Sequence, residues 1–398
     1  MKYGGWSQRI EKVEPFHVME VINAVKRLEA QGRHIIRLEV GEPDFPTPVP
    51  VLTAAHRSLD LDQTRYTAAM GIMELRQAVS AWYQRQYGVD IDPARIVITP
   101  GTSGAFLLAF GILLDPGDRV AISDPGYPCY PNMIRILGGE PVAIAVGPEH
   151  HYQLSPELLE PALAHGLKAA LVTSPSNPTG TLIPDAAMAA VIAMMEHAGG
   201  RVISDEIYHG ITYERRARTA LEFSQEAIVI NGFSKFFAMT GWRLGWIIVP
   251  PSALRHVESL QQNLFISAPT LSQYAALAAF QCEETLKKQI EEFDHNRLFL
   301  VTELRRFGFM IPVMPTGAFY VYADASRVLQ KTGYADAQSF CADLLEQGGV
   351  AVTPGLDFGR YKAQDHIRFS FATTMENVRE GVARLAGFLG GSLPRQTR

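Results

Sequence analysis

Short apolar runs alternate with longer helical stretches between about residues 50 and 280. Seven of these runs predict strands, at Ile96–Thr99, Arg119–Ser123, Glu140–Val146, Ala169–Thr173, Arg201–Ser204, Ala227–Gly232 and Leu244–Val249. Because helical segments separate most of them, the pattern predicts a mainly parallel sheet covered by helices on both faces. Ligands of such sheets bind beyond the carboxyl ends of the strands, so candidate chemistry is sought there.

The pattern changes toward both ends of the chain. Residues 18–30 have helical periodicity and residues 35–40 form a short apolar run, which predict a helix and then a strand. Residues 271–307 contain no proline and predict one long helix or two abutting helices. Two short apolar runs follow, at 317–322 and 366–371, so this part of the chain predicts a smaller α+β domain.

The length of 398 residues is too great for one ordinary core, and two domains are expected. We predict an N-terminal arm that belongs in part to the small domain at residues 1–43, a large domain at 44–285, and the C-terminal small domain at 286–398.

Composition and charge exclude several classes of protein. Hydrophobic residues make up 47% of the chain and charged residues 19%, which is a globular balance. The formal net charge is -5 and basic runs are short, so no nucleic-acid partner is expected. Three widely spaced cysteines indicate neither a disulfide framework nor a metal site. No apolar run has membrane-spanning length and none near Met1 is of signal-peptide type, so a cytoplasmic protein is expected.

Lys235 carries the strongest chemical signal. It follows a predicted buried strand within residues 231–243, NGFSKFFAMTGWR. Lysines are rarely buried without reason, and desolvation lowers the pKa of a lysine, so that its neutral amine becomes available as a nucleophile. A surface lysine that extends to solvent is the alternative.

Asp205 follows the strand predicted at 201–204, in the segment SDEIY. A carboxylate at the carboxyl end of a strand can pair with a protonated pyridine nitrogen, which accepts carbanion charge better than a neutral one. Tyr208 can point the same way if a helical turn begins here, and its hydroxyl could bind a phenolic oxygen. Helix capping is the alternative for Asp205, and Glu206 is expected to be structural.

Two turns that follow strands offer binding groups. In residues 174–180, SPSNPTG, two prolines and a glycine fix a rigid turn, and the amide of Asn177 can donate to an anionic oxygen. A plain Asn-Pro turn is the alternative. In residues 99–105, TPGTSGA, small residues precede an apolar helix at 106–114 and let backbone N–H groups close on a phosphate. That turn lacks both the P-loop lysine and the GxGxxG spacing.

Two arginines and two tyrosines complete the candidates. Arg243 follows Lys235 by eight residues and could contact the same phosphate. Arg368 lies inside an apolar run, and a buried guanidinium suits a carboxylate such as that of an amino acid, or else an internal ion pair. Tyr127 could lay its ring on a cofactor or belong to the core. Tyr66 lies on a predicted surface loop and suits a contact with the site of another subunit.

The order of these motifs resembles the class I and II aminotransferases of pyridoxal 5′-phosphate (PLP) fold type I, from Gly41 to Arg368. The resemblance implies an α/β fold: a large domain with a mainly parallel seven-stranded sheet sandwiched by helices, plus a smaller α+β domain. It also implies a PLP cofactor and a homodimer whose active sites lie at the subunit interface. The implied reaction moves an amino group from an amino acid to a 2-oxo acid in two half-reactions.

The resemblance implies catalytic roles for three residues. Lys235 would form the Schiff base and shuttle the proton, Asp205 would pair with the pyridine nitrogen, and Tyr208 would hold the phenolic oxygen together with Asn177. Tyr127 would stack on the ring.

The resemblance also implies which groups bind phosphate and substrate. The implied phosphate ligands from the same subunit are Gly101, Thr102, Ser103, Ser234 and Arg243. Tyr66 would reach the phosphate bound in the other subunit. Arg368 would bind the substrate carboxylate, assisted by Asn177 and the backbone of Gly41.

One departure from the family bears on the substrate. Relatives that prefer aspartate often carry a lysine in the phosphate turn, where this chain has Ser103 and Gly104. Aspartate specificity is therefore not expected. An apolar side-chain pocket could be built by Phe16, Tyr130, Phe319 and Tyr320. We expect a neutral or aromatic amino donor, with 2-oxoglutarate or pyruvate as the acceptor.

Three other activities fit parts of the pattern. A PLP-dependent β-lyase, decarboxylase or cyclopropane-carboxylate-synthase-like enzyme would keep almost all of these residues. A non-catalytic regulator on the same fold usually carries a fused DNA-binding domain, for which no N-terminal extension is expected here. A nucleotide-dependent oxidoreductase would need the GxGxxG fingerprint that the chain lacks.

Overall fold

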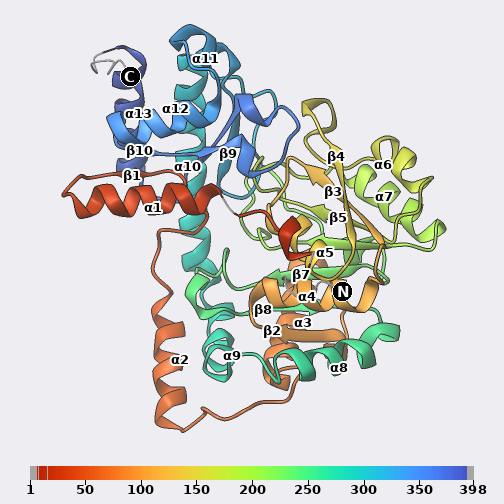
Figure 1. Ribbon diagram of the computed structural model, residues 1–398. Helices are drawn as coiled ribbons and strands as arrows, with labels where there is room; N and C mark the ends of the chain where they lie inside the picture. The colour runs from red at the N-terminus through yellow and green to blue at the C-terminus, as the bar shows by residue number, and fades with distance from the viewer. Residues whose placement is uncertain (1–6, 8, 16, 392–398) are drawn as a thin grey trace.

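The computed structural model describes residue 7, residues 9–15 and residues 17–391, the side chain of His17 excepted. Figure 1 shows two lobes, one built around a large sheet and the other around α1 (His17–Ala30), α11 (Ser326–Thr332), α12 (Ala337–Asp343) and α13 (Met375–Leu389). The long helix α10 (Glu283–Phe307) runs from the first lobe into the second. The domain boundaries after residues 43 and 285 remain predictions.

The large sheet has seven strands in the order β2-β8-β7-β6-β5-β3-β4. Its strands are β2 (Ile96–Thr99), β3 (Arg119–Asp124), β4 (Glu140–Ala145), β5 (Ala169–Thr173), β6 (Arg201–Asp205), β7 (Ile228–Gly232) and β8 (Gly245–Ile248). Only β8 runs against its neighbours β2 and β7, while the other adjacent strands pair in parallel. The predicted mainly parallel, seven-stranded sheet is confirmed.

Helices cover both faces of this sheet. Successive strand residues point to opposite faces, and the apolar ones on each face pack against helices. The surrounding helices are α3 (Met73–Tyr87), α4 (Gly101–Leu113), α5 (Cys129–Ile136), α6 (Pro156–Leu163), α7 (Asp185–His197), α8 (Leu254–Leu264) and α9 (Thr270–Leu277). On β6, Val202 packs in a buried cluster that contains side chains of α3 and α7. The next residue, Ile203, packs in another cluster with side chains of α4, α5 and α8. Helix α2 (Val49–Asp60) packs against α9.

The second lobe contains two small sheets. Strand β1 (Ile36–Arg37) pairs in parallel with β10 (Val350–Ala351). This pairing joins two segments that are more than 300 positions apart in the sequence. Strands β11 (Thr353–Pro354), β12 (His366–Ser370) and β9 (Tyr320–Asp324) form an antiparallel sheet in that order. Arg368 lies on the central strand, β12, and β9 next to it carries Tyr320.

Two predicted strands differ from the structure in their bounds. The strand predicted at 35–40 keeps only two residues on β10, because Leu38 already turns its carbonyl to Ser370 of β12. The strand predicted at 317–322 begins at Tyr320, since Ala318 bonds to Ile211 instead and has a φ of 53°. The stretch at 271–307, predicted as one long helix or two abutting helices, consists of two helices, α9 and α10, joined by the 3₁₀ turn Ala279–Gln281.

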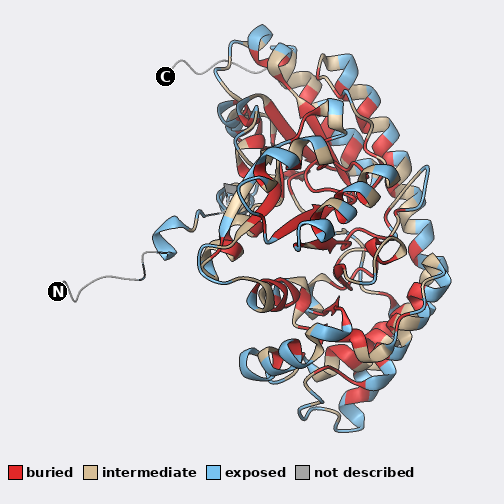
Figure 2. Cartoon of the chain, turned by 90° about the vertical axis from the view of Figure 1, so that its right-hand side faces the viewer, coloured by how far each residue is buried: buried red, intermediate tan, exposed pale blue. Residues whose placement is uncertain are grey.

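Burial follows this layered arrangement. Figure 2 shows most strands and the inner helix faces as buried, with exposed residues on the outer helix faces, while the edge strand β4 is half-buried or exposed. Within the part of the chain that the structure describes, no helix has both the length and the apolar character needed to cross a membrane.

Candidate active site

A cavity of about 300 Å³ opens at one edge of the large sheet, where the carboxyl ends of β2, β3, β5, β6 and β7 meet. The predicted site residues that line it are Gly41, Thr102, Ser103, Tyr127, Asn177, Asp205, Tyr208, Lys235 and Arg368. They come from both lobes, because Arg368 lies on β12 and Gly41 follows β1. These residues lie around one cavity, and the roles predicted for them remain predictions.

Lys235 follows β7 and reaches into the cavity. Its Nζ donates to the carbonyl oxygen of Gly41 and lies 5.9 Å from the ring centres of Tyr208 and Phe319. The surrounding protein desolvates the ammonium group, which lowers the pKa of Lys235 to about 8, against the opposing charge of Glu42. A lysine with a lowered pKa retains a substantial neutral fraction near neutral pH, and neutral amine is the form that attacks carbonyls and takes protons.

Asp205 ends β6 and is buried on the cavity side. Its Oδ2 accepts a 2.5 Å hydrogen bond from the hydroxyl of Tyr130, and its Oδ1 accepts the N–H of Ile207 at 3.1 Å. Burial raises the pKa of Asp205 to about 6, opposed by the hydrogen bond from Tyr130. Sequence reasoning missed this role for Tyr130. Its position three residues after Tyr127, at the start of a helix that faces the strand ends, was the available signal.

Tyr208 and Tyr320 both line the cavity and lie side by side. Their hydroxyls are 2.9 Å apart. A Cβ on residue 41 would lie 2.9 Å from the Tyr320 hydroxyl, so the close approach of the chain explains why a glycine stands at Gly41. Tyr130 and Tyr320 line the cavity as predicted, whereas Phe319 is fully buried and packs between Tyr208 and Phe293. Phe16, the fourth predicted pocket residue, lies outside the described residues.

Arg368 is buried beside the cavity, and the hydrogen bonds it makes to described residues go to neutral groups. Its guanidinium donates to Asn177 Oδ1 at 3.0 Å, to the carbonyl of Glu39 at 2.6 Å and to Thr353 Oγ1 at 3.3 Å. Its Nε is buried without a hydrogen-bond partner. Among the described residues no carboxylate forms an ion pair with Arg368, so the alternative of an internal pair is not supported. A buried, unpaired guanidinium is a receptor for an anion.

The turn before α4 lies against β8 and Arg243. A Cβ on residue 245 would stand 2.9 Å from the backbone nitrogen of Thr102, so Gly245 lets the amino end of α4 approach the sheet. Gly101, with a φ of 68°, faces the Arg243 guanidinium, whose nitrogen would be 2.7 Å from an added Cβ. Ser234, the residue before Lys235, is buried. A helix amino terminus next to a guanidinium suits a phosphate.

Tyr127 and helix α1 complete the lining of the cavity, whereas Tyr66 lies outside it. The ring of Tyr127 lines the cavity and packs edge-on to Tyr130 at 5.3 Å. Tyr66 does not line it and is 80% exposed in the single chain. Sequence reasoning did not foresee that α1 provides apolar lining, from Val18, Met19 and Ile22. The amphipathic period of residues 18–30 was its only signal.

A mainly parallel sheet with a lysine, a carboxylate and an arginine around one cavity at its carboxyl edge defines an α/β enzyme of PLP fold type I. The profile of the family "Aminotransferase class I and II" matches residues 33–385. The chain belongs to this family, and the resemblance that its motifs indicated is confirmed.

Relatives agree along nearly the whole chain. A valine–pyruvate aminotransferase of Mycobacterium tuberculosis is 41% identical, over 95% of this chain and 97% of the relative. A (5-formylfuran-3-yl)methyl phosphate transaminase of Methanocaldococcus jannaschii is 40% identical, over 96% of this chain and 99% of the relative. The crystal structure of an aminotransferase from Mycobacterium tuberculosis has a TM-score of 0.93 at 40% identity, covering 98% of this chain and 100% of its own.

Proposed function

We propose that this aminotransferase uses PLP to move an amino group from a neutral or aromatic L-amino acid to a 2-oxo acid such as 2-oxoglutarate or pyruvate. The observation that carries the proposal is the placement of Lys235, Asp205 and Arg368 around one cavity. The amine of Lys235 suits an aldehyde carbon, the carboxyl of Asp205 suits a pyridine nitrogen, and the guanidinium of Arg368 suits a carboxylate.

The residues present fit PLP. Asp205 offers a buried carboxyl to a ring nitrogen, and Tyr208 and Asn177 offer donors to a phenolic oxygen on the same wall. Residues 101–103 and Arg243 would hold the phosphate at the amino end of α4. When bound, PLP supplies an electron sink that stabilises negative charge at the substrate Cα.

The protein's own groups would orient the substrate and move its proton. Arg368 would bind the α-carboxylate, with Asn177 beside it, and so fix the Cα next to Lys235. Because burial lowers the pKa of Lys235 to about 8, its amine can take the proton from the Cα and deliver it again. Asp205 would hold a proton on the ring nitrogen, since its carboxylate is shielded from water.

The rest of the cavity favours a neutral side chain. Lys235 and Arg368 are the only lysine or arginine among the described lining residues, and both have roles already. The remaining lining includes Val18, Met19 and Ile22 and the buried Asp357, so a second substrate carboxylate would lack a cation. The name of the valine–pyruvate relative supports the same substrate class.

We further propose a cytoplasmic homodimer in which Tyr66 contributes to the site of the second subunit. Large apolar side chains are exposed along α2 and the loop after it, at Val49, Leu52, Leu59, Leu61 and Tyr66. An exposed apolar surface of this kind suits a partner of the same chain.

The test is to reconstitute the protein with PLP and add single amino acids without a 2-oxo acid. Loss of the yellow colour, with release of the matching 2-oxo acid and accumulation of pyridoxamine phosphate, is expected for neutral or aromatic donors. Release of ammonia or of an elimination product instead would favour the lyase alternative. A protein that stays colourless with PLP would contradict the proposal.

A further inference from the structure

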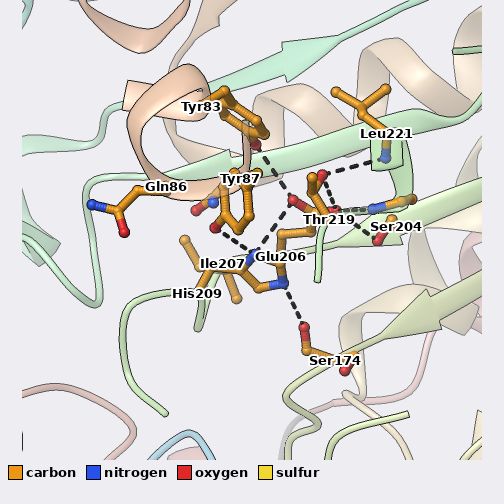
Figure 3. Close-up of polar contacts among 12 residues, drawn as sticks. Tyr83, Gln86, Tyr87, Ser174, Ser204, Glu206, Ile207, His209, Thr219 and Leu221 are labelled. Carbon is orange, nitrogen blue, oxygen red and sulfur yellow. Dashed lines mark hydrogen bonds and ion pairs between the residues drawn. The ribbon is translucent and has the colours of Figure 1, made fainter. Parts of the chain in front are cut away.

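A second group of polar side chains lies behind the end of β6, on the face away from the cavity. It consists of Tyr83 and Tyr87 of α3, Glu206, His209, Ser204, Thr219 and the carbonyl of Ser174; we call it the Glu206 cluster (Figure 3). Its position follows from strand alternation, because Asp205 faces α5 and Glu206 therefore faces α3. The cluster does not line the cavity, and the proposed chemistry does not use it.

Glu206 is fully buried and accepts several hydrogen bonds on one oxygen. Its Oε1 accepts the hydroxyl of Ser204 at 3.1 Å, the hydroxyl of Thr219 at 2.9 Å and the N–H of Ala220 at 2.9 Å. Burial raises the pKa of Glu206 to about 8, which favours the neutral carboxyl at pH 7, against the hydrogen bonds on Oε1. Its Oε2 accepts the hydroxyl of Tyr83 at 3.4 Å and lies 3.5 Å from Nδ1 of His209.

His209 has a fixed tautomer. Its Nε2 lies 2.9 Å from the carbonyl oxygen of Ser174, and because a carbonyl can only accept, Nε2 carries the hydrogen. Its Nδ1 is 2.8 Å from the hydroxyl of Tyr87 and therefore accepts from it. Burial lowers the pKa of His209 to about 3, and the charge of Arg216 adds to this effect. The ring is neutral.

The bond from His209 to Ser174 joins two segments that carry site residues. Backbone pairing between β5 and β6 reaches the Ser174 N–H, which donates to the Asp205 carbonyl at 3.3 Å. Beyond that point one segment leads to Asn177 and the other to Tyr208, and the cavity lies between them. Past the bond from Ser174 to Asp205, no described backbone hydrogen bond joins the two segments. The side chain of His209 joins them there instead.

We infer that His209 is a positioning residue: its Nε2–H holds the 174–177 turn against the Tyr208 turn, so that Asn177 stays in register with Arg368 for the substrate carboxylate. The inference rests on the proposed function for the role of Arg368. Its premise, a neutral His209 with the hydrogen on Nε2, is a property of the folded chain alone.

Two substitutions separate the contacts of His209. In His209→Gln the side-chain amide nitrogen can occupy the place of Nε2 and still donate to Ser174, whereas the bond from Tyr87 is lost. In His209→Asn the amide lies where Nδ1 was, so the contact with Tyr87 survives and the donor to Ser174 is lost. Both variants replace a buried ring by a smaller amide, and His209→Asn removes one methylene group more than His209→Gln does, so a control for packing loss is needed.

The inference predicts a split between these variants in the reconstituted enzyme. The KM of the amino donor should rise about five- to tenfold in His209→Asn relative to His209→Gln, the size expected for one hydrogen bond, with kcat changed much less. Leu345→Ala serves as a control that lowers the melting temperature, because Leu345 packs in a buried cluster separate from the one that contains Tyr83. Equal KM values in the two histidine variants would overturn the inference.

A measurement on the unsubstituted protein keeps the inference testable if either variant misfolds. In ¹⁵N NMR of histidine-labelled protein, the resonance of His209 should show the neutral, Nε2-protonated tautomer at every pH from 5 to 8. A ring that titrates near pH 6.5, or carries its hydrogen on Nδ1, would overturn the inference. Because this signal needs no substrate, failure of transamination with an intact tautomer would reject the proposed function only.

Discussion

Asp205 and Glu206 are consecutive buried carboxyl groups with opposite surroundings. Asp205 faces the cavity, where one tyrosine and one backbone N–H bind it, and burial raises its pKa to about 6. Glu206 faces α3, where three donors saturate one of its oxygens, and burial raises its pKa to about 8. At pH 7 the first is ionised and the second is neutral.

This difference shows how the fold separates reaction from support. Polar groups on the cavity side are left open to a ligand: Arg368 has no carboxylate partner among the described residues, and its Nε is unpaired. On the rear side, Glu206 and His209 have hydrogen-bond partners in the protein itself. Buried groups left unsatisfied are costly and mark sites of function. Changes on the cavity side should therefore alter chemistry, and changes on the rear side should alter stability or register.

The largest effect is expected for Lys235→Ala on the cavity side. The variant loses the amine that moves the Cα proton, so turnover should fall by about 10³-fold or more, while PLP should still bind without a covalent link. Single-turnover rates with an amino donor, and cofactor retention after gel filtration, measure the two parts. Transamination at a near-normal rate would show that Lys235 is not the proton carrier.

Asp205→Asn and Glu206→Gln test the two carboxyls as a matched pair. The first removes a negative charge opposite the proposed ring nitrogen and should lower kcat by about 10²-fold or more. The second replaces a neutral carboxyl by a neutral amide of the same shape, so its effect on kcat should be far smaller. Measuring the kcat of both variants at pH 7 tests this expected difference. Equal losses would mean that both carboxyls act on the reaction, or that neither does.

Arg368→Ala should raise the KM of every amino donor by about 10- to 100-fold, because a hydrogen-bonded charge pair with the carboxylate is lost. A panel of neutral, aromatic and acidic donors measures this. Arg360→Ala is the control, since its ion pair with Glu14 is exposed and worth little. An effect confined to acidic donors would place Arg368 at the substrate side chain instead.

The sequence is sufficient to predict the large sheet and most cavity residues. The central strands β5, β6 and β7 are buried on both faces, so their apolar runs are continuous, and Asn177, Asp205 and Lys235 lie at or just beyond their carboxyl ends. Lys235, Asp205 and Asn177 can therefore be assigned to one edge of the sheet from the sequence alone. The order of the motifs carries the same information and indicates the family.

The features that the sequence does not reveal depend on contacts between distant segments. The hydrogen bond from Tyr130 to Asp205 spans 75 positions, and that from His209 to Ser174 spans 35. Glu206 could be expected to be structural, but its raised pKa follows from burial beneath distant segments, against the hydrogen bonds from residues 219–220, which lower it. The strand predicted at 317–322 began too early because Ala318 is bonded to Ile211, a partner that local periodicity does not reveal.

The smallest expected effect concerns stability between pH 6.5 and 8. An unfolded Glu206 loses its proton near pH 4.5 and the folded one near pH 8, so its contribution is complete below 4.5 and lost as pH rises to 8. His209 acts in the opposite sense, between its folded pKa of about 3 and 6.5, and Asp205 changes below pH 6. Lys235, with a folded pKa of about 8, changes above pH 8.

Among these four groups, Glu206 changes stability most inside the chosen window, and Lys235 opposes it only near the upper limit. The free energy of unfolding of the unsubstituted protein should fall across it by at most about 1.4 kcal/mol per pH unit, and Glu206→Gln should flatten this slope. Urea unfolding at fixed protein and cofactor concentrations measures the difference between the two proteins. Identical slopes would mean that Glu206 is ionised in the folded state, and the contrast with Asp205 would then rest on hydrogen bonding alone.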